Sequence, residues 1–492
     1  MLGWRTACVS KNQFQMIKSI KYFIALGLFF FNVNLNAQYT LLSQFGNLTE
    51  CDTLSRGIFV VWWDKNWDYS DDAGRLLDTM LLYREQCLEE LNMEDPPNPQ
   101  AGFFYNVYLH HGGDIFPDWW GNGQGTDGNG YPYLTLPIGA HNDWVNVAHE
   151  TFHVFQYSAN APGFSYSGDS QWYIEASANW YAAYRYKEFS RAFLEAESLV
   201  RLPHVPLWLS YDNFPADYPQ NWQRYVHQYA LALLLYYLTE ESGLAPTFIT
   251  SGLFSGTDQL PQEYFYNYLG ADVFRAQFMD WAAHMTNHFD FLTPAQIAVL
   301  ENEWNDYADP ADDNEFIEIF DNEGSGGWYR PDDDRVSRGW AFNTYKLLNS
   351  DSCIYHFELN GDMAGSKGDA SFFQGRVLVK NASAGAQFYE LPMDNAQQGF
   401  LSLEVSPEDS EIFFIIGSVP EVFEDVAQTF SYEMRIVKED IVSAASEPLM
   451  EAMPEVIGRY NVSGQPVRED YEGIQVILYG DGRVERKLVR KW

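Results

Sequence analysis

The spacing of hydrophobic and polar residues predicts two successive lobes in the first three hundred residues. The apolar run 57–62 is typical of a buried strand, and segments 103–110 and 131–137 alternate like strands. Between them, segment 72–92 has apolar side chains at helical spacing on one stripe, namely Leu76, Met80, Tyr83 and Cys87. From about 142 to 300 the spacing is that of long helices. We therefore expect an α+β domain with a strand-rich first lobe and a helical second lobe.

A different pattern fills residues 338–440. Short strands without helices are separated by turns rich in Gly, Asp and Ser, which is typical of a β-sandwich. The strands are expected at 353–359, 373–380, 385–391, 399–405, 411–417 and 429–437. Because segment 309–336 is acidic and rich in Gly, we place the boundary between a first domain, 38–335, and the sandwich there.

The N-terminal residues have the pattern of an export signal. Lys18 and Lys21 precede the apolar run 23–31, which is too short to span a bilayer, and a small residue, Ala37, stands at the expected cleavage point. We expect residues 1–37 to be a signal peptide, with Met16 as a better start than Met1. No later stretch is long and apolar enough for a transmembrane helix, so we expect an exported, soluble protein.

The C-terminal residues predict a separate small β meander. A linker, 441–455, leads to segment 456–492, where alternating strands are broken by Ser-Gly, Glu-Gly and Asp-Gly turns. The segment holds seven Lys or Arg against five Asp or Glu in an otherwise acidic chain. Its Tyr-Asn-x-x-Gly-Gln start, central Gly-Ile-x-Val-Ile strand and basic last strand resemble the C-terminal sorting domain of Bacteroidetes type IX secretion substrates. The resemblance implies the type IX secretion machinery as a partner and a secreted or cell-surface location.

Composition excludes some classes of protein. Hydrophobic residues make up 46% of the 492 residues, which excludes a disordered chain, and the net charge of −38 disfavours binding to nucleic acids. The predicted mature chain holds three cysteines. Cys51 and Cys87 are able to pair in an oxidising compartment, with Cys353 left over, but simple burial of all three is an equal alternative.

The segment His149-Glu150-Thr-Phe-His153 carries the clearest chemistry. Asn142 or Asp143 can cap a helix here, and residues four apart lie on one helix face, so both imidazoles can bind one ion. Glu150 is rotated about 100° around the axis, which directs its carboxylate toward a bound water rather than the ion. A pair of hydrogen-bonded histidines on a helix face is the alternative, because the pentapeptide alone is only moderately specific.

A second predicted helix supplies a third ligand. It begins after Asp169 or Ser170 and carries Glu175 and Asn179 on one face. Two His and one carboxylate leave one tetrahedral position open, as a catalytic zinc site requires. The strand at 131–137 directly precedes the first of the two helices. We expect it to be an edge strand that pairs with an extended peptide.

Together, the His-Glu-x-x-His helix, the Glu-Ala-x-x-Asn helix and the preceding strand resemble the gluzincin zinc metallopeptidases. The resemblance implies Zn²⁺ held by His149, His153 and Glu175, with Glu150 as the general base. Asn179 stands where thermolysin-like members place an aspartate that orients a zinc-bound histidine. An amide accepts the same hydrogen bond but adds no charge, which implies a less basic ligand.

The segment 225–243 resembles the Tyr-x-x-Gly-x-x-x-Leu helix of aminopeptidase-type gluzincins. That resemblance implies Tyr229 as the donor to the oxyanion, with His227 as the second choice. The alternative, that both side chains only pack this apolar helix, stays open. A Gly/Asn/Asp loop at 121–130 offers Asp127 and Asn129 to Ca²⁺. It lacks the ligand spacing of a calcium loop, which favours a lid or a plain turn.

These features lead to one main hypothesis and two alternatives. The main hypothesis is a secreted zinc metallopeptidase that hydrolyses peptide or protein substrates through an activated water. The first alternative is a cell-surface protein that binds glycans or proteins and retains the fold without hydrolysis. The second is a peptidase that acts on glycosylated proteins, with the β-sandwich as its targeting module.

Overall fold

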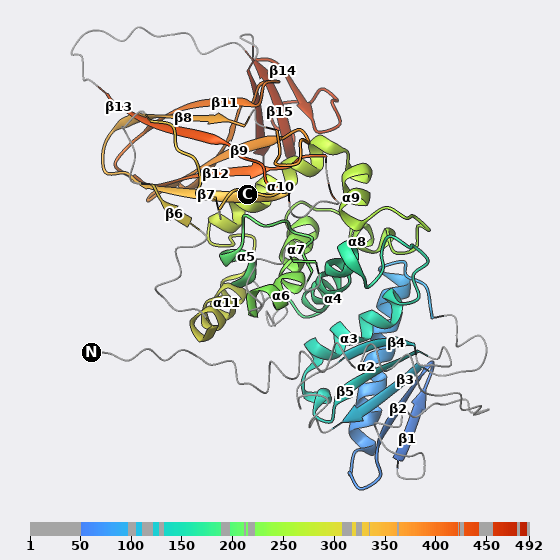
Figure 1. The fold of residues 1–492 in the computed structure, drawn as a ribbon. Helices are drawn as coiled ribbons and strands as arrows, with labels where there is room; N and C mark the ends of the chain where they lie inside the picture. The colour runs from blue at the N-terminus through green and yellow to red at the C-terminus, as the bar shows by residue number, and fades with distance from the viewer. Residues whose placement is uncertain are drawn as a thin grey trace, which may run out of the picture. The chain divides into compact units, whose positions relative to one another are not determined.

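The fold is described from a computed structural model, shown as a ribbon in Figure 1. The described residues are 51–96, 105–110, 122–126, 132–187, 197–210, 213–214, 222–307, 317–320, 327–333, 335–361, 364–421, 423, 428–441, 456–479 and 483–489. They form two compact units, 1–440 and 441–492. The predicted signal peptide, residues 1–37, and the candidate calcium ligands Asp127 and Asn129 lie outside the described residues.

The first lobe is a five-stranded sheet with helices packed on it. Its elements are β1 (Cys51–Arg56), β2 (Phe59–Asp64), α2 (Ser70–Glu89), β3 (Tyr105–His110), β4 (Asn122–Thr126) and β5 (Pro132–Pro137), in the strand order β1-β2-β3-β5-β4. β2, β3 and β5 run parallel to one another, and the two outer strands are antiparallel to their neighbours. The predicted apolar stripe of α2 is fully buried, which confirms the helical pattern in this segment.

The position of β5 corrects one prediction. The strand at 131–137 was expected at the edge of the sheet, but β5 pairs with β3 on one side and with β4 on the other. β4 is the edge strand instead, and it lies within the 121–130 segment for which a loop was expected. Its sequence, Asn-Gly-Gln-Gly-Thr, has no apolar alternation, so its strand conformation depends on pairing with β5.

The second lobe is helical, as the spacing predicts. Its helices are α3 (Trp144–Gln156), α4 (Gln171–Arg185), α5 (Glu197–Arg201), α6 (Trp222–Ala230), α7 (Ala232–Glu240), α8 (Pro246–Ser251), α9 (Pro261–Leu269), α10 (Ala271–Thr286) and α11 (Pro294–Tyr307). α4 packs against α3, α6 and α7 and is buried along almost its whole length, as expected for a central helix. Leu231 separates α6 from α7, so the segment expected as one helix is two.

The third part is a two-sheet sandwich. One sheet has the order β10-β9-β12-β7-β6 and the other β11-β8-β13. The strands are β6 (Ile317–Ile319), β7 (Ala341–Leu348), β8 (Cys353–Asn360), β9 (Phe373–Asn381), β10 (Gly385–Leu391), β11 (Gln398–Val405), β12 (Asp409–Ser418) and β13 (Glu433–Asp440). Strands lie in all six predicted segments, with the predicted ends at 385–391 and shifted ends in the other five, and β6 and β7 were not predicted. One apolar core, which includes Tyr355, Phe357 and Phe414, joins the two sheets.

The larger sheet of the sandwich is covered on its other face by α10 (Figure 1). Phe278 and Trp281 of α10 belong to the same hydrophobic cluster as Phe342 and Phe413 of the sandwich. The sandwich therefore continues the core of the helical lobe, and the expected boundary at 309–336 falls within a single compact unit.

Residues 441–492 form the second compact unit. β14 (Val456–Asn461), β15 (Gly473–Tyr479) and β16 (Val484–Val489) make a three-stranded antiparallel sheet in chain order, which confirms the predicted meander. Among the described residues, no disulfide joins Cys51 to Cys87, and Cys87 and Cys353 are buried. Among the described residues, none of the helices combines the length and the apolar character needed to cross a membrane.

Candidate metal centre

The two predicted ligand helices lie side by side and bring their polar side chains together. α3 begins at Trp144 because the Asp143 side chain accepts a hydrogen bond from the Asn146 backbone N–H at 3.2 Å. α4 begins after Ser170, which makes no side-chain capping hydrogen bond. α3 and α4 pack closely, and the side chains that face each other include the predicted ligands.

His149, His153 and Glu175 converge on one point. His149 Nε2 and His153 Nε2 are 3.1 Å apart, and Glu175 Oε2 lies 3.3 Å from the first and 3.6 Å from the second. All three side chains are buried. Within the described part of the chain, this is the one group of three or more His, Cys, Asp or Glu side chains whose ligand atoms lie within 4.8 Å of one another.

This triangle of atoms fits a zinc ion. Zinc bonds of about 2.0–2.1 Å at tetrahedral angles place neighbouring donor atoms about 3.3 Å apart. The three observed separations, 3.1, 3.3 and 3.6 Å, bracket that value. Two imidazole nitrogens and one carboxylate oxygen are also a donor set that zinc adopts at catalytic sites, where a fourth position stays open.

Hydrogen bonds at the far side of each ring fix which nitrogen faces the site. Asn179 Oδ1 lies 2.7 Å from His149 Nδ1, and Gln156 Oε1 lies 2.6 Å from His153 Nδ1. An amide oxygen only accepts, so each Nδ1 carries a proton, and each Nε2 is the nitrogen that faces the site and binds a metal once its own proton is lost. The Gln156 amide is itself held, since its Nε2 donates to Ile174 O at 3.0 Å and Ser177 Oγ at 2.7 Å.

The pKa values of His149 and Glu175 are shifted in opposite directions, so that each group favours the charged form of the other. Burial alone lowers the pKa of His149, but hydrogen bonding to Glu175 and the charges of Glu150 and Glu175 outweigh it and raise that pKa to about 9. Burial alone raises the pKa of Glu175, and the hydrogen bonds from His149 and His153 outweigh it, so the net shift is downward. Glu175 is therefore an ionised carboxylate at neutral pH, as a metal ligand must be.

Glu150 lies beside this group without belonging to it. It is 6% exposed, and its charge contributes to the raised pKa of His149, so its carboxylate is close to the first predicted ligand. It is not one of the three converging donors. This is the arrangement expected for a carboxylate that acts on a water rather than on the metal.

Two buried tyrosines lie close to the carboxylates of Glu175 and Glu150. Tyr157 stacks on His153 at 5.7 Å between ring centroids, and its pKa is raised well above 10 by burial and by the charge of Glu175. Burial and the charge of Glu150 likewise raise the pKa of Tyr105. Both hydroxyls are therefore protonated at neutral pH and able to donate hydrogen bonds.

Of the two candidate oxyanion donors, Tyr229 lies beside the metal site, whereas His227 contacts other residues. The Tyr229 ring stacks beside His149, with ring centroids 6.1 Å apart and planes inclined by 27°, so this residue reaches the site. His227 is fully buried, and its ring nitrogens contact Ser198 Oγ at 2.7 Å and Pro206 O at 3.2 Å. Because both nitrogens are engaged elsewhere, the second choice, His227, is not supported.

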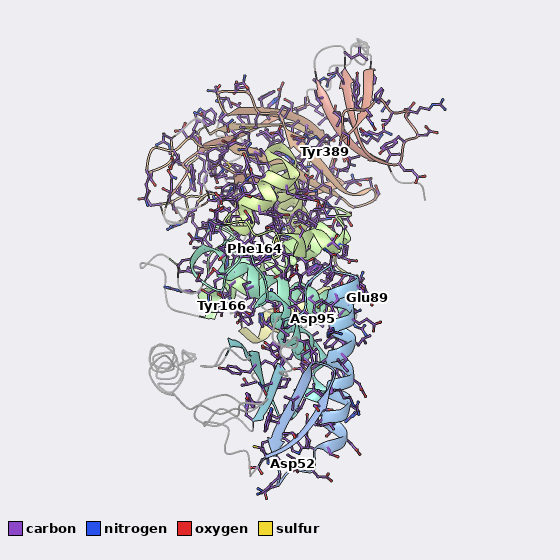
Figure 2. All side chains as sticks on the ribbon, turned by 90° about the vertical axis from the view of Figure 1, so that its right-hand side faces the viewer. Asp52, Glu89, Asp95, Phe164, Tyr166 and Tyr389 are labelled. Carbon is purple, nitrogen blue, oxygen red and sulfur yellow. The ribbon has the colours of Figure 1, made fainter. Side chains whose placement is uncertain are left out.

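The site residues that the sequence did not predict are Gln156, Tyr157, Tyr105 and Tyr166. Gln156 follows His153 by three positions, so both lie on one helix face, and that spacing was a signal available in the sequence. Tyr166, in the loop between α3 and α4, is labelled in Figure 2 and is 44% exposed. Burial and the charge of Glu175 raise the pKa of Tyr166 well above 10, so its phenol lies close to that carboxylate.

Comparison with known proteins gives weak structural likenesses and one family. No curated protein matches the sequence. The M60 catalytic domain with CBM51 domains of Clostridium perfringens ZmpB is 9% identical, with a TM-score of 0.27 over 98% of this chain and 70% of that one. The pre-peptidase C-terminal domain of a Bacillus anthracis collagenase is 6% identical, with a TM-score of 0.17 over 24% of this chain and 93% of that one. The family model DUF6055, described as a family of unknown function, matches residues 88–436, and the chain belongs to this family.

Proposed function

We propose that this protein is an exported zinc-dependent peptidase. The observation that carries the proposal is the triangle of His149, His153 and Glu175 donor atoms, whose edges match those of a tetrahedral zinc site. The oriented Nδ1 hydrogen bonds and the adjacent Glu150 support a catalytic role, because a purely structural zinc site has four protein ligands and needs no neighbouring base.

The chain's own residues have separate tasks in this proposal. A bound zinc would lower the pKa of a water and polarise the substrate carbonyl. Glu150 accepts the proton of the attacking water and returns it to the leaving amine. The Tyr229 hydroxyl donates a hydrogen bond to the oxygen that becomes negative during attack. β4, the edge strand of the first sheet, can pair with an extended peptide and hold it beside α3.

The test replaces Glu150 by Gln in the full chain. We expect the variant to bind zinc as the unaltered protein does but to lose about 100-fold or more of its activity against a denatured-protein panel. Glu89→Gln, an exposed carboxylate at the end of α2 (Figure 2), is the matched control and leaves activity unchanged. Zinc bound without turnover in the unaltered protein supports the alternative of a non-catalytic binding protein. Unchanged proteolysis in Glu150→Gln overturns the assigned base.

We also propose that the two ends of the chain direct export. Residues 1–37 act as the signal peptide, and residues 456–492 as the sorting domain that the type IX secretion machinery recognises. The separate, compact β14–β16 sheet supports this, because an address has to fold independently of its cargo. A fusion of residues 441–492 to an exported reporter in a Bacteroidetes host is expected to reach the cell surface. Retention of the reporter in the periplasm would contradict the proposal.

A further inference from the structure

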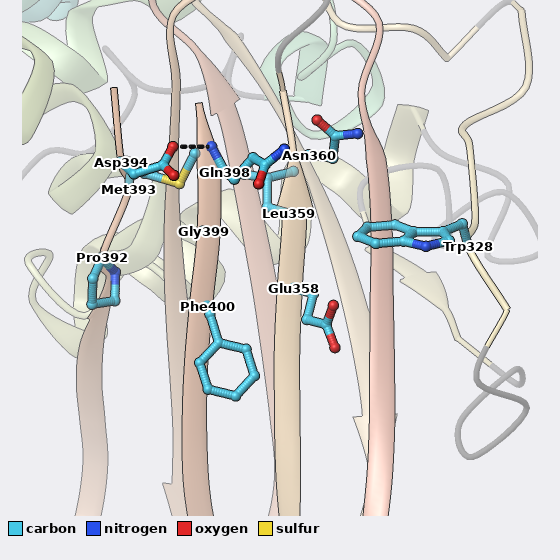
Figure 3. Close-up of a pocket in the computed structure, with 10 residues that line it drawn as sticks. All are labelled: Trp328, Glu358, Leu359, Asn360, Pro392, Met393, Asp394, Gln398, Gly399 and Phe400. Carbon is cyan, nitrogen blue, oxygen red and sulfur yellow. Dashed lines mark hydrogen bonds between the residues drawn. The ribbon is translucent and has the colours of Figure 1, made fainter. Parts of the chain in front are cut away.

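The outer face of the smaller sandwich sheet holds a groove that plays no part in the metal centre. Its volume is about 550 Å³, and it is lined by Trp328, by residues of β8 and β11 and by the turn before β11 (Figure 3). Two large aromatic side chains are exposed in it, Trp328 at 46% and Phe400 at 55%. We propose that this groove binds a neutral oligosaccharide, independently of the proposed peptidase function.

The register of the sheet places the two aromatics at opposite ends of one row. Phe400 is opposite Glu358, and Glu358 is opposite Arg435. Tyr329 bridges to Met434, so Trp328 lies one strand spacing beyond Arg435. Three strand spacings amount to ~14 Å. That separation suits a chain of several sugar rings rather than one sugar.

The aromatic rings are held in defined orientations by their neighbours. The Arg435 guanidinium lies 5.0 Å from the centroid of the Trp328 ring, and His356 lies parallel to Phe400 with centroids 5.9 Å apart. In Figure 3 the Phe400 ring is seen face-on and the Trp328 ring edge-on, so one forms a floor and the other a wall. Exposed ring faces attract the slightly positive C–H groups on the flat side of a sugar ring.

Glu358 lies in the row between the two rings, and two amide side chains lie in the neighbouring row, where sugar hydroxyls would need partners. Glu358, Asn360 and Gln398 line the groove. Asp394 is part of the rim, and its carboxylate accepts from the backbone N–H groups of Ala396 and Gln398, both at 2.9 Å. An aromatic platform combined with a few fixed amide and carboxylate groups is the composition of a small-molecule site rather than of an apolar protein interface.

The charges indicate a neutral ligand. Two cations lie beside the groove: Arg330, which is paired with Glu433, and Arg435, whose Nη2 donates to both oxygens of Glu358 at 2.6 Å. Their charges are thus neutralised by these two carboxylates, while Asp394 adds a negative charge at the rim. With a net charge of −38 on the whole chain, an acidic glycan would be repelled.

A peptide and a second copy of the chain fit less well. β8 is the central strand of this sheet and pairs with β11 and β13 on its two sides, so its backbone groups are not available to an added strand. Two aromatic side chains also offer far less apolar area than a stable dimer interface buries.

The experiment measures binding of the full-length protein to cellohexaose, xylohexaose, mannohexaose and chitohexaose by calorimetry, with chelator present so that the metal centre takes no part. An oligogalacturonate hexamer serves as the acidic probe. We expect at least one neutral hexamer to bind, and Trp328→Ala and Phe400→Ala each to weaken that binding about tenfold or more. Tyr268→Ala is the matched control, because Tyr268 is 62% exposed on α9, away from the groove, and it should bind as the unaltered protein does.

Phe400→Ala is the variant that disturbs the fold less, because Phe400 is more exposed than Trp328, and Trp328 also contacts the Arg435 guanidinium. Thermal melting of each variant confirms that it is folded. The proposal is overturned if no neutral hexamer binds, if only the acidic hexamer binds, or if folded Phe400→Ala binds as tightly as Tyr268→Ala. None of these outcomes bears on hydrolysis, which is assayed separately with zinc.

Discussion

Asn179 accepts a hydrogen bond from His149 Nδ1 across 2.7 Å and thereby links α4 to the first predicted ligand on α3. Groups in this position orient metal-bound histidines and tune their basicity, and their loss costs roughly 10- to 100-fold in metal affinity. We expect Asn179→Ala to weaken zinc binding by that factor. Asn179→Asp adds a negative charge behind the ring and should tighten it. Competition with a chromogenic chelator measures both affinities.

The order of zinc affinity among Asn179→Asp, the unaltered protein and Asn179→Ala tests the role of this hydrogen bond. If the affinities run Asp above Asn above Ala at position 179, the hydrogen bond acts through ligand basicity. Equal affinities in all three would contradict the assigned role and would place the metal away from His149.

Gln156 orients His153 as Asn179 orients His149, but it lies on α3, the same helix as the histidine that it contacts. Its Oε1 lies 2.6 Å from His153 Nδ1, and its amide N–H groups are held by Ile174 O and Ser177 Oγ. Gln156→Leu removes the acceptor and leaves those partners buried without it. We expect about 10- to 100-fold weaker zinc binding, together with a loss of stability on the order of 2 kcal/mol. Urea denaturation of the metal-free protein isolates the second effect. Weaker zinc binding in Ser177→Ala would show that the amide's orientation matters.

The sequence brought together the three candidate ligands because their placement depends on local spacing. His149 and His153 share a face through the helical repeat alone, and Glu175 follows on the next helix. The edge strand was assigned wrongly because β4 lacks apolar alternation. Its place in the sheet depends on pairing with β5, which spacing along the chain does not reveal.

The long apolar run of β12 has a similar explanation. In a sandwich strand that faces water on one side, alternate residues are polar, but Ile412–Ser418 is buried throughout. α10 covers the outer face of this sheet, so both faces of β12 are buried. The pattern is explained by the contact between α10 and β12, which are distant in the sequence. Because spacing along the chain does not reveal that contact, the sequence alone suggested two separate domains.

Glu175 should couple zinc to folding. A ligand that binds only the folded state at 100 times its dissociation constant raises the free energy of unfolding by about 2.7 kcal/mol. We expect saturating zinc to raise the melting temperature of the unaltered protein. In Glu175→Gln, where a neutral amide replaces the carboxylate, most of that increase should be lost. Glu89→Gln, on the surface of α2, should retain it. An equal increase in Glu175→Gln would remove this residue from the ligand set.

Buried histidines should make the fold sensitive to acid. Burial lowers the pKa of His227 to about 4. Burial, followed by the positive charge of Arg335, lowers the pKa of His204 to about 3. In the unfolded chain both titrate near 6.5. Below that pH the unfolded state binds protons that the folded state excludes, so stability is full above about pH 6.5 and falls as the pH drops toward 4.

Each such histidine contributes a slope of about 1.4 kcal/mol per pH unit within that window. Between roughly pH 4.5 and pH 6, we expect the slope of the free energy of unfolding against pH to be smaller by about that amount in His227→Gln. Urea denaturation at several pH values measures it. A slope identical to that of the unaltered protein would mean that His227 is protonated in the folded state.

The contact between α10 and the sandwich predicts that the first 335 residues do not fold alone. Arg376 of β9 is 4% exposed, and its Nε lies 2.9 Å from Asp280 Oδ1 on α10. Gly417 of β12 approaches so closely that an added Cβ would lie 2.1 Å from Met279 Sδ. A chain cut at residue 335 would expose Phe278 and Trp281, which are buried against the sandwich.

We therefore expect fragment 38–335 to aggregate, and fragment 38–440 to unfold in one transition. Asp280→Ala leaves the Arg376 guanidinium buried with the Gly375 carbonyl, which accepts from Nη1 at 3.1 Å, and with the more distant Glu390 carboxylate at 4.0 Å. It should destabilise fragment 38–440 by about 3 kcal/mol. Asp272→Ala, at an 89% exposed carboxylate on the same helix, should change little. Two separate transitions in calorimetry, with only one of them shifted by Asp280→Ala, would show instead that the sandwich folds independently of the helical lobe.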